Sequence, residues 1–291
     1  MLDRIAAAPI SWGICEAPGW GMQLDPRRVL GEMRELGITA TELGALGWLP
    51  TEPTALRTML DEYGMRMIGG FVPLIMHRAD KADQLVAEAR SAAETLVAGG
   101  GQHFVSALVS SHESWEHLEI SSAEWATVFE NLLIVDEIAA EHGLVQVVHP
   151  HVNTLLELDE EFQRFLDNSP VKFTLDTGHL YIGGANPVEI AEKHSDRVGL
   201  VHIKDVDMAV AGRMRAGELT LMTATQAGLF PAAGNGDVPI AATIAALETR
   251  GYPGWYVLEQ DVALTDGEPP LGEGPVLGVR QSIEYLKSLA A

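Results

Sequence analysis

Residues 145–151 read VQVVHPH, a short run rich in β-branched side chains that stops at His149 and His151. Three later runs have the same form: FTLDTGH at 173–179, LVHIKD at 200–205 and WYVLE at 255–259. Each ends in residues that bind metal ions. Because parallel strands bring their carboxyl ends to one face, four consecutive strands that end in this way predict one shared site.

Outward from these runs, segments typical of strands and of helices alternate along the whole chain. The predicted strands are 8–12, 40–43, 67–72, 103–108, 145–149, 173–176, 200–203 and 256–259. Helical periodicity predicts helices at 25–36, 53–63, 79–98, 122–142, 159–168, 187–194, 240–249 and 275–289. Such alternation implies parallel pairing with right-handed crossovers, and eight units close a (β/α)8 barrel.

An open, doubly wound sheet is the competing α/β architecture. It usually carries a GxGxxG fingerprint after the first strand, and residues 13–21 have no such spacing. We therefore predict one domain, a (β/α)8 TIM barrel over residues 1–291. Residues 207–238 form the longest irregular stretch, which we interpret as a lid or a wall of the substrate site.

Composition narrows the class of partner and the compartment. The formal net charge of −22 argues against nucleic acid or an anionic membrane as a partner. The single cysteine, Cys15, excludes an intrachain disulfide and is compatible with a reducing compartment. The sequence contains no apolar stretch long enough to predict a secretion signal or a membrane span. We expect a cytoplasmic protein with a small-molecule substrate, and leave homo-oligomerisation open.

Four of the strand-end residues are our candidate metal ligands. His149, Asp176, His202 and Glu259 end strands five to eight, so they form an arc on one side of the barrel mouth. Two imidazoles and two carboxylates suit Mn²⁺, Co²⁺, Zn²⁺ or Fe²⁺ better than Ca²⁺. The donor set alone leaves Mn²⁺, Co²⁺, Zn²⁺, Fe²⁺ and Mg²⁺ open.

Residues close to these ligands in sequence are the candidates for proton transfer. His151 and His179 follow two of the ligands by two and three residues, and Lys204 faces the same side of its strand as His202. Glu157, in the loop after strand five, is either a base or a residue that favours the following helix dipole.

Three further residues are candidates for substrate binding. Trp12 and Glu42 lie at the ends of the first two predicted strands, where an aromatic face or a carboxylate suits a polyol ring. Arg215 lies in the long stretch 207–238 and is a candidate for an anionic group of a substrate. The structural alternatives are core packing for Trp12 and a turn cap for Glu42.

With these residues in view, the chain resembles the xylose isomerase-like barrel superfamily, whose pattern is Glu…Asp-x-x-His…His…Glu at strands five to eight. The motifs at 176–179, 201–205 and 258–259 match the last three strands. The segments 8–16, 18–21, 39–44 and 149–151 look like those of the inosose dehydratases. That resemblance implies removal of water from 2-keto-myo-inositol in inositol catabolism, with Mn²⁺ or Co²⁺.

The sequence departs from the superfamily pattern at strand five, where His149 stands in the usual place of Glu. His149, His151 and Glu157 therefore remain alternatives for the strand-five ligand. A metal-bound ketone favours an enediolate, which leads to dehydration or, after reprotonation, to epimerisation or isomerisation. Ketose or sugar epimerase activity is the alternative function. A second alternative is a phosphodiesterase of the endonuclease IV type, which the acidic net charge disfavours. A third is a barrel that binds a sugar without catalysing a reaction.

Overall fold

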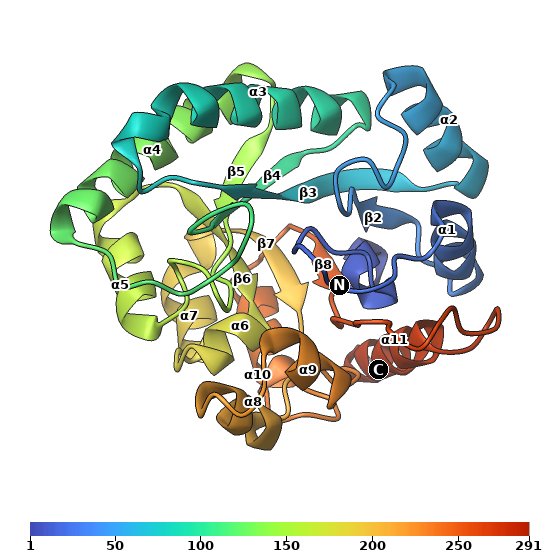
Figure 1. The fold of residues 1–291 in the computed structure, drawn as a ribbon. Coiled ribbons are helices and arrows are strands. Elements are labelled where there is room, and N and C mark those ends of the chain that lie inside the picture. The colour runs from blue at the N-terminus through green and yellow to red at the C-terminus, as the bar shows by residue number, and fades with distance from the viewer. Residues whose placement is uncertain (291) are drawn as a thin grey trace.

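The computed structural model describes residues 1–290 and contains a closed barrel of parallel strands in the order β1 to β8 (Figure 1). The barrel closes where Ile5 of β1 pairs with Tyr256 of β8. Its strands are β1 Ile5–Ala7, β2 Ala40–Glu42, β3 Arg66–Leu74, β4 His103–Leu108, β5 Val145–Val148, β6 Lys172–Asp176, β7 Val198–Ile203 and β8 Tyr256–Leu258. The predicted TIM barrel is confirmed.

Helices surround the barrel as an outer ring (Figure 1). They are α1 Pro26–Glu35, α2 Pro53–Tyr63, α3 Ala82–Ala98, α4 Ser122–Glu141, α5 Asp159–Asn168, α6 Thr177–Ile182, α7 Pro187–His194, α8 Met208–Arg215, α9 Leu221–Gln226, α10 Ile240–Thr249 and α11 Pro275–Leu289. Short 3₁₀ helices lie at Leu2–Arg4, Pro9–Trp12, Ala79–Lys81 and Ser195–Arg197. The predicted helices all correspond to observed ones.

Local chemistry explains where several helices begin. The Ser121 hydroxyl accepts from the Glu124 backbone N–H, and Glu124 accepts in return from the Ser121 backbone, which is a complete capping box before α4. Proline occupies the first turn of α1, α2, α7 and α11, where a backbone N–H is not needed.

Two predictions about the chain's organisation are wrong. The first strand is Ile5–Ala7, and the predicted strand at 8–12 is instead largely the 3₁₀ helix Pro9–Trp12. Pro9 pre-sets the helical φ angle at the start of that turn, which ends the strand early. The stretch 207–238 is not one irregular loop, because it contains α8 and α9.

Small and branched side chains fill the inside of the barrel. This inner cluster consists of Ala6, Ala8, Ala40, Ile68, Val105, Val147, Leu200 and Val257. A larger apolar cluster is built from buried residues of both the strands and the surrounding helices. We call this inner cluster the apolar floor of the barrel, because the candidate site lies directly above it, toward the carboxyl ends of the strands.

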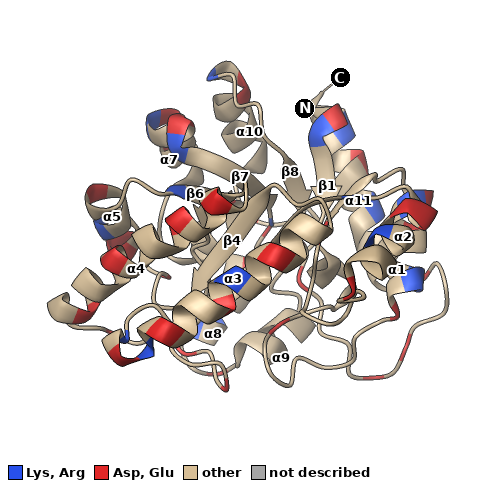
Figure 2. Cartoon of the chain, turned by 90° about the horizontal axis from the view of Figure 1, so that it is seen from above, with Lys and Arg blue, Asp and Glu red and all other residues tan. Residues whose placement is uncertain are grey.

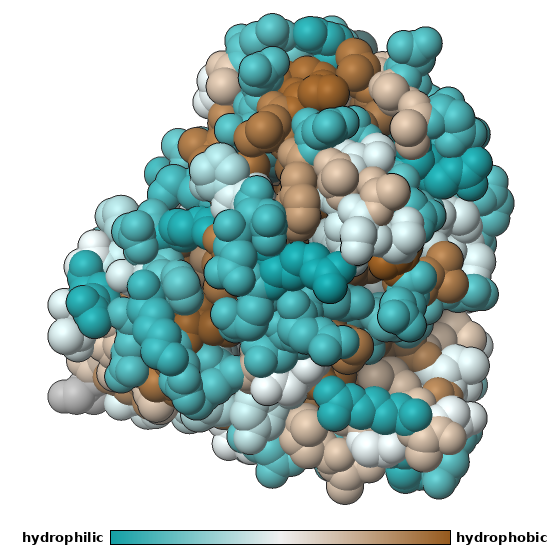
Figure 3. All heavy atoms as spheres, turned by 90° about the vertical axis from the view of Figure 1, so that its left-hand side faces the viewer, coloured by the Kyte–Doolittle hydropathy of each residue, from teal (hydrophilic) through white to brown (hydrophobic). Residues whose placement is uncertain are grey.

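The outside of the molecule is polar. Lys and Arg are interspersed with Asp and Glu on the outer helices, and the two termini lie close together (Figure 2). Hydrophilic residues predominate on the face shown in Figure 3, between smaller hydrophobic areas. Within residues 1–290, no helix combines the length and the apolar character that a membrane crossing requires.

Candidate metal centre

The candidate ligands stand directly above the apolar floor of the barrel. His149, His202 and Glu259 each follow an inner-cluster residue by two positions, namely Val147, Leu200 and Val257. Because side chains alternate along an extended strand, residues two apart face the same side. The same alternation places Glu42 above Ala40 and Asp176 above Thr174, both within the barrel.

Four donor atoms of this group converge on one point. His149 Nε2 lies 3.0 Å from His202 Nδ1, and His202 Nδ1 lies 2.9 Å from Glu259 Oε2. Asp176 Oδ2 lies 3.5 Å from His149 Nε2 and 3.8 Å from His202 Nδ1. Atoms that share one ion at about 2.0–2.2 Å lie roughly 3–3.6 Å apart. All four donors fall within 4.8 Å of one another.

An unsatisfied polar atom at this point supports a bound cation. Asp176 Oδ2 is buried and accepts no hydrogen bond within residues 1–290, whereas Glu259 Oε2 already faces His202 Nδ1 and the Lys204 ammonium. Native proteins rarely leave buried carboxylate oxygens without a hydrogen bond, because the loss of hydration is costly. A divalent ion would satisfy Asp176 Oδ2, so this buried His/Asp/Glu group is consistent with a divalent metal site.

Neighbouring groups fix the orientation of these ligands. Glu42 Oε1 lies 3.2 Å from His202 Nε2, the ring nitrogen that points away from the other ligands. Asp176 Oδ1 accepts a 2.7 Å hydrogen bond from the His179 backbone N–H, which leaves Oδ2 facing the histidines. Carboxylates that hold metal-binding histidines in this way set both the tautomer and the ring angle.

A buried ammonium lies beside the candidate ligands. Lys204 Nζ lies 2.7 Å from Asp261 Oδ1, 2.8 Å from His179 Nε2 and 3.1 Å from Glu259 Oε2. Burial opposes the charge, but Asp261, Glu259 and Asp176 together raise the pKa of Lys204. His151, His179 and Asp261 form a second convergent group, and the ammonium already contacts two of its members.

The histidines nearest the pocket are held neutral. Burial, together with nearby His149 and Lys204, lowers the pKa of His151 to about 3. Burial also lowers the pKa of His149 well below its usual value. A neutral imidazole has a free lone pair, which both metal binding and proton acceptance require.

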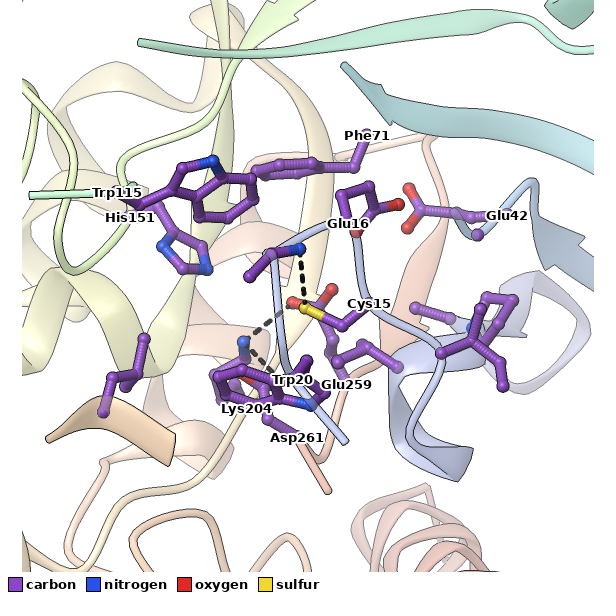
Figure 4. A pocket seen from close by; sticks show the side chains of 17 residues that line it. Cys15, Glu16, Trp20, Glu42, Phe71, Trp115, His151, Lys204, Glu259 and Asp261 are labelled. Atoms are coloured by element: carbon purple, nitrogen blue, oxygen red, sulfur yellow. Dashed lines mark hydrogen bonds and ion pairs between the residues drawn. The ribbon is translucent and has the colours of Figure 1, made fainter. Parts of the chain in front are cut away.

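A pocket opens above this group at the barrel mouth (Figure 4). Phe71, Trp115 and Trp20 are its aromatic lining residues. The polar lining comes from several strand ends and the loop after Trp12: Glu16, Glu42, His151, Lys204, Glu259 and Asp261. Aromatic surfaces beside convergent carboxylates and one ammonium suit a compact, hydroxyl-rich ring.

The structure does not bring three of the predicted site residues to this pocket. Trp12 is fully buried, and its Nε1–H donates to Glu32 Oε2 at 2.8 Å, because it sits on the 3₁₀ helix and packs into the core. Arg215 is exposed at the end of α8. Glu157 Oε2 accepts from the Asn153 backbone N–H at 2.7 Å, and Glu157 is absent from both convergent groups.

Of the three alternatives for the strand-five ligand, His149 is the one whose side chain joins the four-residue group. His151 lines the pocket beside it, with its ring centroid 3.9 Å from that of His179. Lys204 and Glu42 also line the pocket. The roles of all these residues remain predictions.

Sequence reasoning missed several pocket residues. Asp261 lies two residues beyond Glu259, so the alternation along an extended run was a signal that it faces the same way. Glu16 belongs to the loop after the first strand, whose path the sequence does not determine. Phe71 and Trp115 reach the pocket from β3 and from the loop after β4, and neither has a distinguishing motif.

The fold and this group together define a (β/α)8 barrel with a metal-site-like cluster at the carboxyl ends of its strands. Comparison with known proteins gives a match of residues 30–289 to the xylose isomerase-like TIM barrel family. The chain belongs to this family.

Individual relatives extend over nearly the whole chain. It is 30% identical over 298 residues to an inosose dehydratase of Geobacillus kaustophilus, covering 98% of this chain and 94% of the relative. It is also 30% identical to the rhizopine catabolism protein MocC of Rhizobium meliloti, covering 100% of this chain and 90% of that one.

A solved structure has the same fold at lower identity. The crystal structure of IOLI protein with a binding zinc atom superposes with a TM-score of 0.72 at 14% identity, covering 98% of this chain and 97% of that one. This likeness concerns the architecture of the barrel.

Proposed function

We propose that the chain is a divalent-metal-dependent hydro-lyase that removes water from 2-keto-myo-inositol or a closely related keto-cyclitol. The observation that carries this proposal is the convergence of four metal-binding side chains beneath a polar, aromatic-walled pocket. Similarity to inosose dehydratases over nearly the full chain supports the choice of reaction.

His149, Asp176, His202 and Glu259 would hold the ion, which we propose to be Mn²⁺. A divalent ion supplies Lewis acidity, so that the α C–H of a neighbouring ketone becomes more acidic. Glu42 keeps His202 in the orientation in which Nδ1 faces the other three donors.

His151 is the residue that we propose takes up the α proton. It lines the pocket, and its depressed pKa keeps the imidazole neutral at physiological pH. Lys204 and His179 lie behind it as a fixed pair, with the ammonium 2.8 Å from His179 Nε2. The Lys204 ammonium provides fixed positive charge next to the reacting centre.

The lining of the pocket favours an uncharged substrate. Lys204 is the cationic side chain among the described lining residues, and Asp261 and Glu259 already neutralise it. A phosphate group would face the carboxylates of Glu42 and Asp261, which repel it. Hydroxyl groups instead donate hydrogen bonds to these carboxylates, so we propose an unphosphorylated polyol ketone.

Identification of the product tests this proposal. Chelator-treated protein is supplied with Mn²⁺ and 2-keto-myo-inositol, and the product is followed by ultraviolet absorbance and proton NMR. We expect a metal-dependent dione. An epimeric ketone in its place would reject the dehydratase and establish the epimerase alternative, and no change of the substrate would reject both for this compound.

A further inference from the structure

Glu16 is a pocket residue that neither the fold nor the metal group uses. It lies in the loop after the 3₁₀ helix Pro9–Trp12, half-buried, and lines the pocket above the candidate metal centre. The carboxyl groups of Glu16 and Glu42 point toward each other across the pocket (Figure 4). The hydrogen bond that reaches the Glu16 carboxyl comes from its own backbone.

The surroundings of Glu16 favour its neutral form. Burial raises the pKa of Glu16 to about 8, and the carboxylates of Glu42, Glu259 and Asp261 contribute to the shift. The remaining titratable groups that line the pocket are Cys15, His151 and Lys204. These surroundings therefore favour the protonated form of the Glu16 carboxyl group, which faces the ligand space.

Among the titratable groups of the described pocket lining, Glu16 is well placed to give up a proton, because no ion pair within residues 1–290 holds its carboxyl group. Lys204 is an ammonium whose raised pKa and contact with Asp261 hold its proton tightly. His151 is neutral and accepts rather than donates. Asp261 is engaged with Lys204 at 2.7 Å. A general acid works best when its pKa lies near the operating pH, and Glu16 meets this condition.

We propose that Glu16 is the general acid that protonates the departing β-hydroxyl group, an inference that rests on the proposed dehydratase function. Glu16 transfers its proton to the hydroxyl oxygen as the C–O bond breaks, and water leaves with the bonding electrons. The electron pair left by the α proton forms the new C=C bond. Glu16 ends as a carboxylate and regains a proton from solvent.

The test compares Glu16→Gln with the wild type on two substrates. The first is 2-keto-myo-inositol, and the second is an analogue with fluorine in place of the β-hydroxyl, which departs as fluoride without a proton. We expect E16Q to lower kcat on the hydroxyl substrate by about 100-fold or more and to change kcat on the fluoro analogue by less than about threefold. Glu284→Gln, an exposed position on α11, is the matched control.

Two readouts do not depend on loss of water. Metal-dependent exchange of the α proton in D₂O should persist in E16Q, which shows that the variant folds and binds its substrate. The second readout is stability in chelator-treated protein. Because the folded protein binds the Glu16 proton more tightly than the unfolded chain does, Glu16 stabilises the wild type at low pH. This stabilisation is lost as pH rises through about 8. The Tm of the wild type relative to E16Q should therefore fall as pH increases.

The outcomes separate this inference from the proposed function. A wild type that neither exchanges nor dehydrates 2-keto-myo-inositol overturns both. The role of Glu16 alone is overturned if the wild type dehydrates its substrate and E16Q loses activity equally on both substrates. It is likewise overturned if E16Q loses activity on neither substrate. A Tm difference that is constant with pH contradicts it as well.

Discussion

Single residues at the centre of the barrel are held in charged pairs. Glu42 and His202 lie 3.2 Å apart, and Lys204 and Asp261 lie 2.7 Å apart, all four side chains being buried. Buried charges of this kind are tolerated because each has a partner. Removing one member of a pair should therefore change metal binding or stability through the partner that is left behind.

Replacement of Glu42 by Gln should weaken metal binding. The carboxylate at His202 Nε2 raises the basicity of the ring and fixes its tautomer, and loss of such a partner typically costs about 10–100-fold in metal affinity. Calorimetric titration of chelator-treated protein with Mn²⁺ measures the change. An unaltered Kd, with the exposed E284Q variant as reference, would show that Glu42 does not orient His202.

Replacement of Lys204 by Met should destabilise the metal-free protein in a pH-dependent manner. Without the ammonium, Asp261, Glu259 and Asp176 are buried without their cation, and such a loss costs roughly 3–5 kcal/mol. The carboxylates then bind protons more readily when folded than when unfolded, so stability should decline as pH rises.

Urea unfolding at about pH 5 and about pH 8 checks this expectation. The loss should be larger at the higher pH. Lys287→Met, an exposed change on α11, is the control. An equal, small loss at both pH values would contradict the assignment of Lys204 as the partner of three carboxylates.

At this scale, the sequence predicts the residues that end strands better than those that lie in loops. His149, Asp176, His202 and Glu259 were singled out because the strand period and the parallel topology together fix where they point. Trp12 follows the first strand, which ends earlier than its apolar run suggests. Arg215 and Glu157 lie where tertiary contacts, rather than periodicity, decide the direction of a side chain.

Among the elements, the turn from β6 into α6 brings Asp176, at the end of β6, close to Lys204, which follows β7. Asp176 caps α6 by accepting from the His179 backbone, while Gly178 packs on the side chain of Lys204 from β7. A Cβ at Gly178 would lie 2.6 Å from Lys204 Cγ. The absence of a side chain there is what lets Lys204 run past α6 to Asp261.

Gly178→Ala should therefore destabilise the protein by about 1–3 kcal/mol, because the lysine stem has to move within a packed interior. Gly212→Ala in α8 is the matched control, since an added Cβ there meets nothing within 4 Å. It should be neutral or stabilising by up to about 1 kcal/mol. Equal effects of the two changes on urea unfolding would contradict the close approach at Gly178.

Helices can be predicted where the apolar periodicity ends at the same residue as a proline or glycine boundary signal. The helices at Pro53–Tyr63 and Ile240–Thr249 have the predicted bounds, because proline or glycine marks at least one end of each. The helices α8 and α9 were missed because each is short and neither shows a clear apolar stripe in sequence. Short helices depend on their packing partners, which a single sequence does not reveal.

For the whole molecule, we propose that residues 1–291 form a single domain whose stability is coupled to metal binding. Chelator-treated protein should unfold in one cooperative transition, and Mn²⁺ at about 100 times its Kd should add roughly 2.7 kcal/mol. Differential scanning calorimetry of the wild type and of Asp176→Asn measures both effects. Two separate transitions, or an equal gain in D176N, would contradict the proposal. Cytoplasmic location and homo-oligomerisation remain predictions.

We propose that metal bound by His149, Asp176, His202 and Glu259 supports dehydration. The most direct measurement is the initial rate of dione formation from 2-keto-myo-inositol as Mn²⁺ is titrated into chelator-treated protein. We expect a rate that rises and saturates near about one ion per chain, and that is lost in D176N. A rate that is independent of added metal, or unchanged in D176N, would contradict it.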